Sequence, residues 1–412
     1  MPKVMSVITN KGKTSPYTAG KICRLYALHI SGKHKCQLQH QERMGKMDSL
    51  LPKRKGVLLA LLLIATILIS CSTHSPTAVN KITKATPSAG SETDQSDSLL
   101  MENKEEELQE KTTENEEDIV SDQKTEEIFD PSKYSDKLTI RFFHTGASVE
   151  DGSSEGDLIL ITTPDGANML IDAGSPQCGP TLVEFLEKLN VEKLDYAVAT
   201  HMHIDHIGGY TDVLQNIPVD RMIFPNFTNY NSSLASGLMA TLDVKKVPVE
   251  IAKTGDRFML GEHTLIEVLA PEWDITVPEG TIPEKSPGFV NNNCLVLRMT
   301  YKNNSFLFPA DIYWERENIL VKDQAEKLKV DVLKAPHHGS NTSSSIDFIE
   351  TVDPEIVVMT SNSPSKETYD RYKKRDSDIY ITGLDGNILV ISDGDNIEVI
   401  QEHERTIKGY YE

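Results

Sequence analysis

The stretch that decides the fold is Thr200-His201-Met202-His203-Ile204-Asp205-His206-Ile207-Gly208-Gly209. It places three histidines and one carboxylate within six residues, directly after the apolar run 194–200. Residues i and i+2 of an extended segment project to the same side, so His201 and His203 can bind one ion. Asp205 and His206, after the chain turns, can face a second ion. Imidazole together with carboxylate suits Zn, Mn or Fe, so the stretch predicts a metal site.

Outward from this stretch, short apolar runs rich in β-branched residues recur from Leu138 to near the end of the chain. They include LTIRFF, DLILIT, CLVLRMTY and EIVVMTS, and helical patterns lie between some of them, at residues 180–189 and 314–328. Short strands with interspersed helices predict an α/β sandwich of mixed sheets.

Five segments of this region resemble, in order, motifs of the metallo-β-lactamase superfamily. The closest resemblance is to its ComEC competence (DNA-uptake) branch. The segments are GDLILI at 156–161, LIDAG at 170–174, the histidine stretch, NNNCLVL at 291–297 with FLFPAD at 306–311, and LKAPHHGS at 333–340. The resemblance covers roughly residues 138–400. It implies a metallo-β-lactamase-like αββα sandwich, in which two mixed sheets are flanked by helices. It also implies a binuclear-metal hydrolase with a metal-bridging hydroxide as its nucleophile.

The resemblance assigns metal ligands position by position. The first ion would take two histidines, the second a carboxylate and two histidines, and a further aspartate would bridge both ions. The implied ligands are His201, His203, Asp205, His206, Asp311 and His338. His338 is favoured over its neighbour His337 as the ligand that completes the second site. The two ions are expected to be Zn or Mn.

Other residues receive supporting roles from the same resemblance. Asp205 would also orient the attacking water, and His337 would contact the substrate or protonate the leaving group. Asp172 would hold a ligand histidine in the right tautomer. Asn293 is the candidate for the place where many members supply a third histidine to the first ion, because His263 reads as a surface residue. An amide ligand is weaker than imidazole, so this site is expected to bind its ion loosely or to prefer Mn.

The charge of the chain bears on the substrate. The 412 residues carry a net charge of −20, and residues 131–412 alone carry 25 Lys/Arg against 44 Asp/Glu. This excludes a simple basic nucleic-acid-binding protein, and it opposes DNA at long range. Only the run RYKKR at 371–375 and, more weakly, Lys245-Lys246 favour contact with a polyanion.

Three functions stay open. The first is a phosphodiesterase or nuclease of the competence type, acting on DNA. The second is a hydrolase of a cell-wall or small-molecule phosphodiester, such as a phosphorylcholine-type decoration. An aromatic cage that includes Trp273 or Trp314 would support this second function. The third is a non-enzymatic binding lipoprotein, against which the complete ligand set argues.

The N-terminal part predicts export. Lys53-Arg54-Lys55 precede a 15-residue apolar run at 56–70, and Cys71 follows it in a context that resembles a bacterial lipobox. Residues 47–71 are therefore expected to be a lipoprotein signal peptide with Cys71 lipidated. Residues 1–46 would be an untranslated or dispensable extension. An uncleaved membrane-spanning anchor is the alternative reading of the apolar run.

Between the signal and the domain lies an acidic segment. Residues 91–130 carry 16 Asp/Glu against 3 Lys, and large apolar residues are sparse. This composition predicts a disordered linker at 72–137, followed by the hydrolase domain at 138–412. The domain would then sit outside the cytoplasm, held to the membrane by lipid, beside a DNA-uptake machinery or acting alone.

Overall fold

The computed structural model describes residues 123–147, 155–227 and 230–405. All of these belong to one compact unit. The predicted signal peptide at 47–71, Cys71, the extension at 1–46 and most of the predicted linker lie outside the described residues. Within the described ranges, no helix is both long and apolar enough to cross a membrane.

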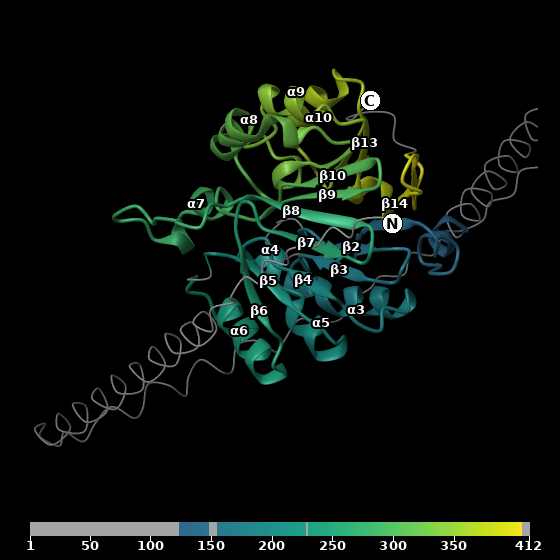
Figure 1. Ribbon diagram of the computed structural model, residues 1–412, viewed down its shortest axis with the longest axis horizontal. Coiled ribbons are helices and arrows are strands. Elements are labelled where there is room, and N and C mark those ends of the chain that lie inside the picture. The colour runs from purple at the N-terminus through teal and green to yellow at the C-terminus, as the bar shows by residue number, and fades with distance from the viewer. Residues whose placement is uncertain (1–122, 148–154, 228–229, 406–412) are drawn as a thin grey trace, which may run out of the picture. The chain divides into compact units, whose positions relative to one another are not determined.

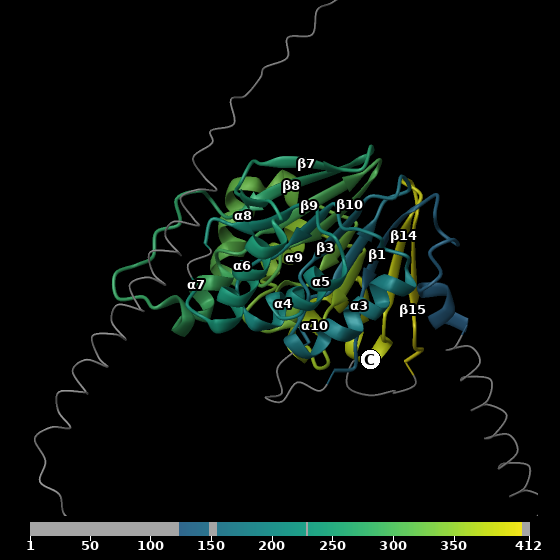
Figure 2. The ribbon, with the colours of Figure 1, turned by 90° about the horizontal axis from the view of Figure 1, so that it is seen from below.

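One sheet has eight strands and joins the two ends of the domain. Strand β14 pairs with β1 and β15 pairs with β14, both in antiparallel fashion, and Figure 2 shows β14 beside β1. Strands β3 to β6 run parallel. Across the sheet the order is β15 (Ile397–Gln401), β14 (Ile388–Ser392), β1 (Leu138–Phe142), β2 (Ile159–Thr162), β3 (Asn168–Ile171), β4 (Tyr196–Val198), β5 (Met222–Pro225) and β6 (Val249–Ala252).

The other sheet has seven strands and is also mixed. Strands β7 to β10 are antiparallel neighbours, and β10 to β13 are parallel. Across the sheet the order is β13 (Asp378–Ile381), β12 (Ile356–Met359), β11 (Val332–Lys334), β10 (Asn304–Phe308), β9 (Val296–Tyr301), β8 (Thr264–Ala270) and β7 (Arg257–Leu260).

Helices cover the outer face of each sheet, so the predicted αββα sandwich is confirmed (Figure 1). Side-chain alternation explains the layers: on β2, Ile159 and Ile161 face the other sheet, whereas Leu160 faces the helices. The helices and 3₁₀ turns are η1 (Pro176–Cys178), α3 (Gly179–Lys188), α4 (Ile204–Ile207), α5 (Tyr210–Asn216), α6 (Ser233–Lys245), η2 (Pro283–Lys285), α7 (Pro287–Asn291), α8 (Trp314–Leu328), η3 (Pro336–Gly339), α9 (Ile346–Val352), α10 (Lys366–Lys373) and α11 (Thr382–Asp385). The first of the two helical patterns read from the sequence corresponds to α3, within one residue at each end, and the second matches α8.

Residues 123–137, which the sequence assigns to the linker, pack on the domain. Ile128 is fully buried against Leu389 and Ile391 of β14. The buried Arg141 donates from Nε to the carbonyl oxygen of Ile128 at 2.8 Å. The folded part therefore begins by residue 123 and not at Leu138, because even one buried Ile and its backbone contact tie this short segment to the sheet.

The strand ends bring the polar motifs together. Asp172 follows β3 and His201 follows β4, its parallel neighbour, while Asp311 follows β10 and His338 follows β11. A hydrogen bond from Leu295 N to Thr200 O, at 2.9 Å, joins the two sheets at this edge. Both sheets thus present their loops to the same place.

Candidate metal centre

The histidine stretch turns sharply after His203. The N–H groups of His206 and Ile207 both donate to His203 O, at 3.2 and 3.1 Å, which starts the short helix α4. His201 and His203 face each other with Nε2 and Nδ1 3.0 Å apart, as the i, i+2 spacing predicts. The His206 ring lies 4.1 Å from the His201 ring, so the two halves of the site adjoin.

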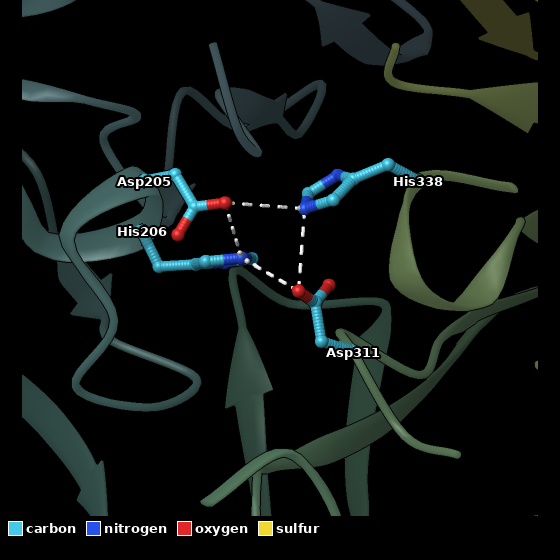
Figure 3. Close-up of side chains that lie close together, drawn as sticks. All are labelled: Asp205, His206, Asp311 and His338. Carbon is cyan, nitrogen blue, oxygen red and sulfur yellow. Dashed lines mark hydrogen bonds and ion pairs between the residues drawn. The ribbon is translucent and has the colours of Figure 1, made fainter. Parts of the chain in front are cut away.

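One cluster of possible metal ligands consists of Asp205, His206, Asp311 and His338, each of which offers one ligand atom within 4.8 Å of the others (Figure 3). Oδ2 of Asp311 lies 3.1 Å from His206 Nε2 and 3.2 Å from His338 Nε2. Oδ2 of Asp205 lies 3.9 and 3.6 Å from the same two nitrogens. Imidazole and carboxylate donors that converge on one point suit a divalent transition metal.

One ring nitrogen of this cluster is placed to bind a metal ion. His338 Nε2 is buried and, although Asp311 Oδ2 lies 3.2 Å away, it makes no hydrogen bond of normal geometry. Leaving a buried polar atom unpaired costs about 1–3 kcal/mol, unless something else takes its lone pair or proton. A divalent cation among these side chains would do so, and the residues present therefore fit a metal centre.

Asp172 lies where the sequence predicts a residue that orients a histidine. It is fully buried, and its Oδ2 accepts from His206 Nδ1 at 2.7 Å and from Thr200 Oγ1 at 2.6 Å. Its Oδ1 accepts from Thr200 N at 2.8 Å. This contact assigns the proton of His206 to Nδ1 and leaves Nε2 facing the cluster.

Asp157 holds His338 in the same way, and the sequence analysis missed it. Its Oδ1 lies 3.2 Å from His338 Nδ1 and accepts from Thr360 Oγ1 at 2.6 Å. The available signal was the GD pair at 156–157. Gly156 has φ 91°, and a Cβ there would lie 1.6 Å from the carbonyl oxygen of Asp205, so only glycine lets the two segments approach.

Lys334 is a second group that the sequence analysis left without a role. The side chain is fully buried, with Nζ 2.6 Å from Asp157 Oδ2 and 3.5 Å from Asp311 Oδ1. Burial opposes its charge, but the two carboxylates outweigh burial and raise the pKa of Lys334 above its usual value. A permanent cation therefore lies behind the cluster.

His337 lies at the rim of the cluster. Its Nε2 is 3.9 Å from Asp311 Oδ2, and its Nδ1 is 2.6 Å from Thr342 Oγ1. Its side chain is 24% exposed, against 8% for His338. Burial lowers the pKa of His337 to about 4, so the ring is neutral at neutral pH. The structure thus draws His338 into the cluster and leaves His337 open to a substrate, while their chemical roles stay predictions.

Asn293, the predicted amide ligand, makes a local hydrogen bond, and its role at the metal stays a prediction. Its Nδ2 donates to Phe289 O at 2.7 Å. Asn291, the last residue of α7, is 1% exposed, and its Oδ1 is buried without a hydrogen-bond partner. Asn291 therefore offers the unsatisfied oxygen that an amide ligand needs. His263 is exposed, as predicted, and Cys178 and Cys294 are buried free thiols.

The pKa values of the histidines in the site are shifted in opposite directions. Burial lowers the pKa of His201 and of His203. At His206 burial also opposes protonation, but Asp311 and Asp172 outweigh it and raise the pKa well above its usual value. Burial thus dominates the pKa of His201 and His203, which have no strong carboxylate partner. The surrounding carboxylates dominate the pKa of His206.

The loops at the site carry backbone strain. Asp172, Ala310, His337 and His338 all have φ between 48° and 58°. Residues other than glycine rarely adopt this region, and such strain clusters at functional sites. Ala310 precedes Asp311 directly, and its φ of 52° is a conformation that only glycine adopts without steric cost.

A buried glutamate fixes the loop that carries Thr342. Glu317 of α8 is fully buried, and its carboxylate accepts the backbone N–H groups of Ser344 and Ser345. Arg371 Nη1 donates to the carbonyl oxygens of Ser343 and Ser344 in the same loop. Burial raises the pKa of Glu317 to about 6.

Glu317→Gln is expected to gain stability relative to the unchanged protein as the pH rises. The pKa of Glu317 is higher in the folded state than its reference value of 4.5, so its contribution is full below pH 4.5 and is lost as the pH rises through about 6. The difference in the free energy of unfolding between Glu317→Gln and the unchanged protein should change by about 2 kcal/mol between pH 4.5 and about pH 6. Urea unfolding at a series of pH values measures it. The exposed Glu367→Gln is the control, and a pH-independent difference contradicts the assignment.

The sequence profile of the metallo-β-lactamase superfamily matches residues 155–361, which is half of the chain. The chain belongs to the metallo-β-lactamase superfamily. The match spans the histidine stretch, Asp311 and His338, and this superfamily membership together with the ligand cluster makes the chain a metal-dependent hydrolase by fold and site.

Three curated relatives are similar to part of the chain, and one of them, competence protein ComA of Neisseria gonorrhoeae, is 27% identical over 211 residues, 51% of this chain and 26% of that protein. ComE operon protein 3 of Bacillus subtilis is 28% identical over 185 residues, which cover 45% of this chain and 22% of that protein. Recombination protein 2 of Haemophilus influenzae is 23% identical over 255 residues, 59% of this chain and 29% of that protein. The chain thus spans less than a third of the length of these relatives. A solved metal-dependent hydrolase of the β-lactamase superfamily is 14% identical, covers 59% of this chain and 95% of its own, and gives a TM-score of 0.38.

Proposed function

We propose that the chain is a binuclear-metal phosphodiesterase, and a nuclease of the competence type in the first place. The observation that carries the proposal is the convergence of Asp205, His206, Asp311 and His338, with His201 and His203 beside them. The names of two relatives, Recombination protein 2 and competence protein ComA, favour DNA as the substrate. When bound, two divalent ions supply Lewis acidity and a water of near-neutral pKa.

The residues of the chain divide the remaining work. Asp205, partly exposed beside His338, orients the attacking water. His337, which Thr342 holds at Nδ1, presents Nε2 toward the leaving group. The Tyr313 ring lies 5.0 Å from the His337 ring, and the Tyr230 ring lies 6.0 Å from His203. These two aromatic faces flank the site and can stack on the bases of a single strand.

The basic run at 371–375 gives DNA less support than its sequence suggests. Arg371 is engaged with the loop at 343–344, and Tyr372 is fully buried. Arg375 pairs with Glu350 and Asp353. The weaker support from this run leaves substrate recognition mainly to the metal centre, which keeps a small or cell-wall phosphodiester as the second candidate. Trp273 and Trp314 each lie under a cation of the protein, Lys253 and Arg371, so they favour no choline cage.

Cleavage of labelled single-stranded DNA tests the proposal. Residues 99–412 are purified, because the segment before Leu138 is part of the fold, and are reconstituted with Mn²⁺ or Zn²⁺. Bis(p-nitrophenyl) phosphate serves as a generic phosphodiester. The expected result is metal-dependent cleavage of DNA that Asp205→Ala abolishes and the exposed His263→Ala preserves. Cleavage of the generic ester alone would move the substrate to a small phosphodiester, and cleavage of neither would reject the proposal.

The place of action belongs to the same proposal. We infer that the domain works outside the cytoplasm, tethered through a lipidated Cys71, because an apolar run of signal-peptide length and a lipobox-like context precede it. Incorporation of labelled palmitate, lost in Cys71→Ala, is the expected result. A Cys71→Ala protein that is still labelled and membrane-bound would contradict the anchor.

A further inference from the structure

Lys334 is the one lysine side chain that is buried among the residues that the structure describes. It lies at the end of β11, three residues before His337, and its Nζ has three oxygen neighbours. These are Oδ2 of Asp157 at 2.6 Å, Ala310 O at 3.1 Å and Oδ1 of Asp311 at 3.5 Å. The ammonium therefore lies between a carboxylate of the metal cluster and the carboxylate that orients His338.

The two oxygens of Asp311 face different partners. Oδ2 faces the imidazoles of His206 and His338, at 3.1 and 3.2 Å. Oδ1 points away from them, toward Lys334. A carboxylate held in this way can give metal ions one oxygen, because the other is turned toward a fixed positive charge.

The positive charge of Lys334 also affects the stability of the metal-free protein. Asp157 is 1% exposed and Asp311 2% exposed. Burying two carboxylates without a counter-charge is costly, and breaking a buried ion pair by removing one partner typically destabilises a protein by several kcal/mol. Lys334 contacts both carboxylates and helps to offset their charge in the metal-free chain, together with the histidines beside Asp311.

We propose that Lys334 is a positioning residue of the metal centre. It turns Oδ1 of Asp311 away, leaves Oδ2 to the metals, and keeps the ligand set assembled when no metal is bound. The cost is a weaker hold on the metals, since a positive charge beside Asp311 repels a divalent ion. The proposal rests on the chain being a metal-dependent hydrolase and is independent of its substrate.

Lys334→Met and Lys334→Gln test this role. Both remove the charge, and Gln keeps a hydrogen-bond donor near Ala310 O and Asp157. Metal affinity is expected to rise about tenfold in either variant, because the repelling charge is gone. The metal-free protein is expected to unfold at a lower temperature, and saturating Mn²⁺ is expected to raise that temperature more than it does in the unchanged protein.

Isothermal titration with Mn²⁺ and with Zn²⁺, and thermal unfolding with and without metal, give these readouts. Lys329→Met is the matched control, because it removes an exposed lysine that pairs with Asp353 at 3.1 Å. Two results together would contradict the proposal: the variants are destabilised equally with and without metal, and their metal affinity is unchanged or weaker. Lys334 would then stabilise the fold without positioning Asp311 for the metals. If Lys334→Met is not recovered folded, Lys334→Gln decides by the same two measurements. A failed DNA-cleavage assay would leave all of these values untouched.

Discussion

Replacing Asp311 with Asn should lower the rate of metal-dependent hydrolysis about a thousandfold or more while the fold is retained. Asp311 is the carboxylate on which His206 and His338 converge, and an amide there carries no charge to hold two divalent ions. Metal ions contribute several kcal/mol of charge stabilisation in such sites, and each 1.4 kcal/mol corresponds to about a factor of ten in rate.

The measurement for Asp311→Asn joins turnover to metal content. The rate is measured with the best phosphodiester substrate, and bound metal is counted by elemental analysis after gel filtration. Asp220→Asn is the control, because that carboxylate is exposed and pairs only with Lys193 at the surface. Unchanged turnover with a full complement of metal in Asp311→Asn would break the two-metal interpretation.

Asp172→Asn should lower metal affinity and turnover by about ten- to a hundredfold, although Asp172 contacts no metal. Its Oδ2 accepts the Nδ1 proton of His206, and its Oδ1 accepts the backbone N–H of Thr200. An amide has one acceptor and must turn its NH₂ group toward one of these donors. Where it faces His206, the ring takes the opposite tautomer and its Nε2 lone pair is lost to the metal.

Titration of apo protein with Zn²⁺ measures the effect of Asp172→Asn, and circular dichroism checks that the fold persists. Asp195→Asn is a fair comparison, since Asp195 also accepts a backbone N–H, from Asn168, within the same sheet. Equal metal affinity in Asp172→Asn and in the unchanged protein would show that the tautomer of His206 is set elsewhere.

The sequence was sufficient for the ligands that lie close together in the chain. His201, His203, Asp205 and His206 share six residues, so the period of an extended segment and one turn place them without knowledge of the rest. Asp311 and His338 were implied by the resemblance to the family's motifs, and the structure places both directly after neighbouring parallel strands, β10 and β11.

The sequence was insufficient where the partners are distant. Asp157 and Thr360 are 203 residues apart, and only the packing of two sheets brings the hydroxyl to the carboxylate. Three consecutive asparagines at 291–293 look alike in sequence, and the end of α7 decides which oxygen is buried. The basic run at 371–375 likewise changes meaning once α10 buries Tyr372.

The end of the predicted linker, residues 123–137, was expected to be disordered, but it packs on the domain. Residues 123–137 are rich in charged and polar side chains, and a single Ile-Phe pair forms no hydrophobic period typical of a helix or a strand. Their apolar partners, Leu389 and Ile391, come from the far end of the chain. A composition rule averages over a window and cannot register a single buried anchor.

The entry and exit of the domain meet at one spot, where Lys124 Nζ lies 2.8 Å from Glu404 Oε1 and Thr125 Oγ1 donates to Glu402 at 2.9 Å. A circular permutant that joins these ends through a short loop is therefore geometrically natural, with new termini in an exposed turn such as Glu262–His263. A force applied to both ends of the domain would therefore act first on these two contacts, which lie away from the residues of the metal centre.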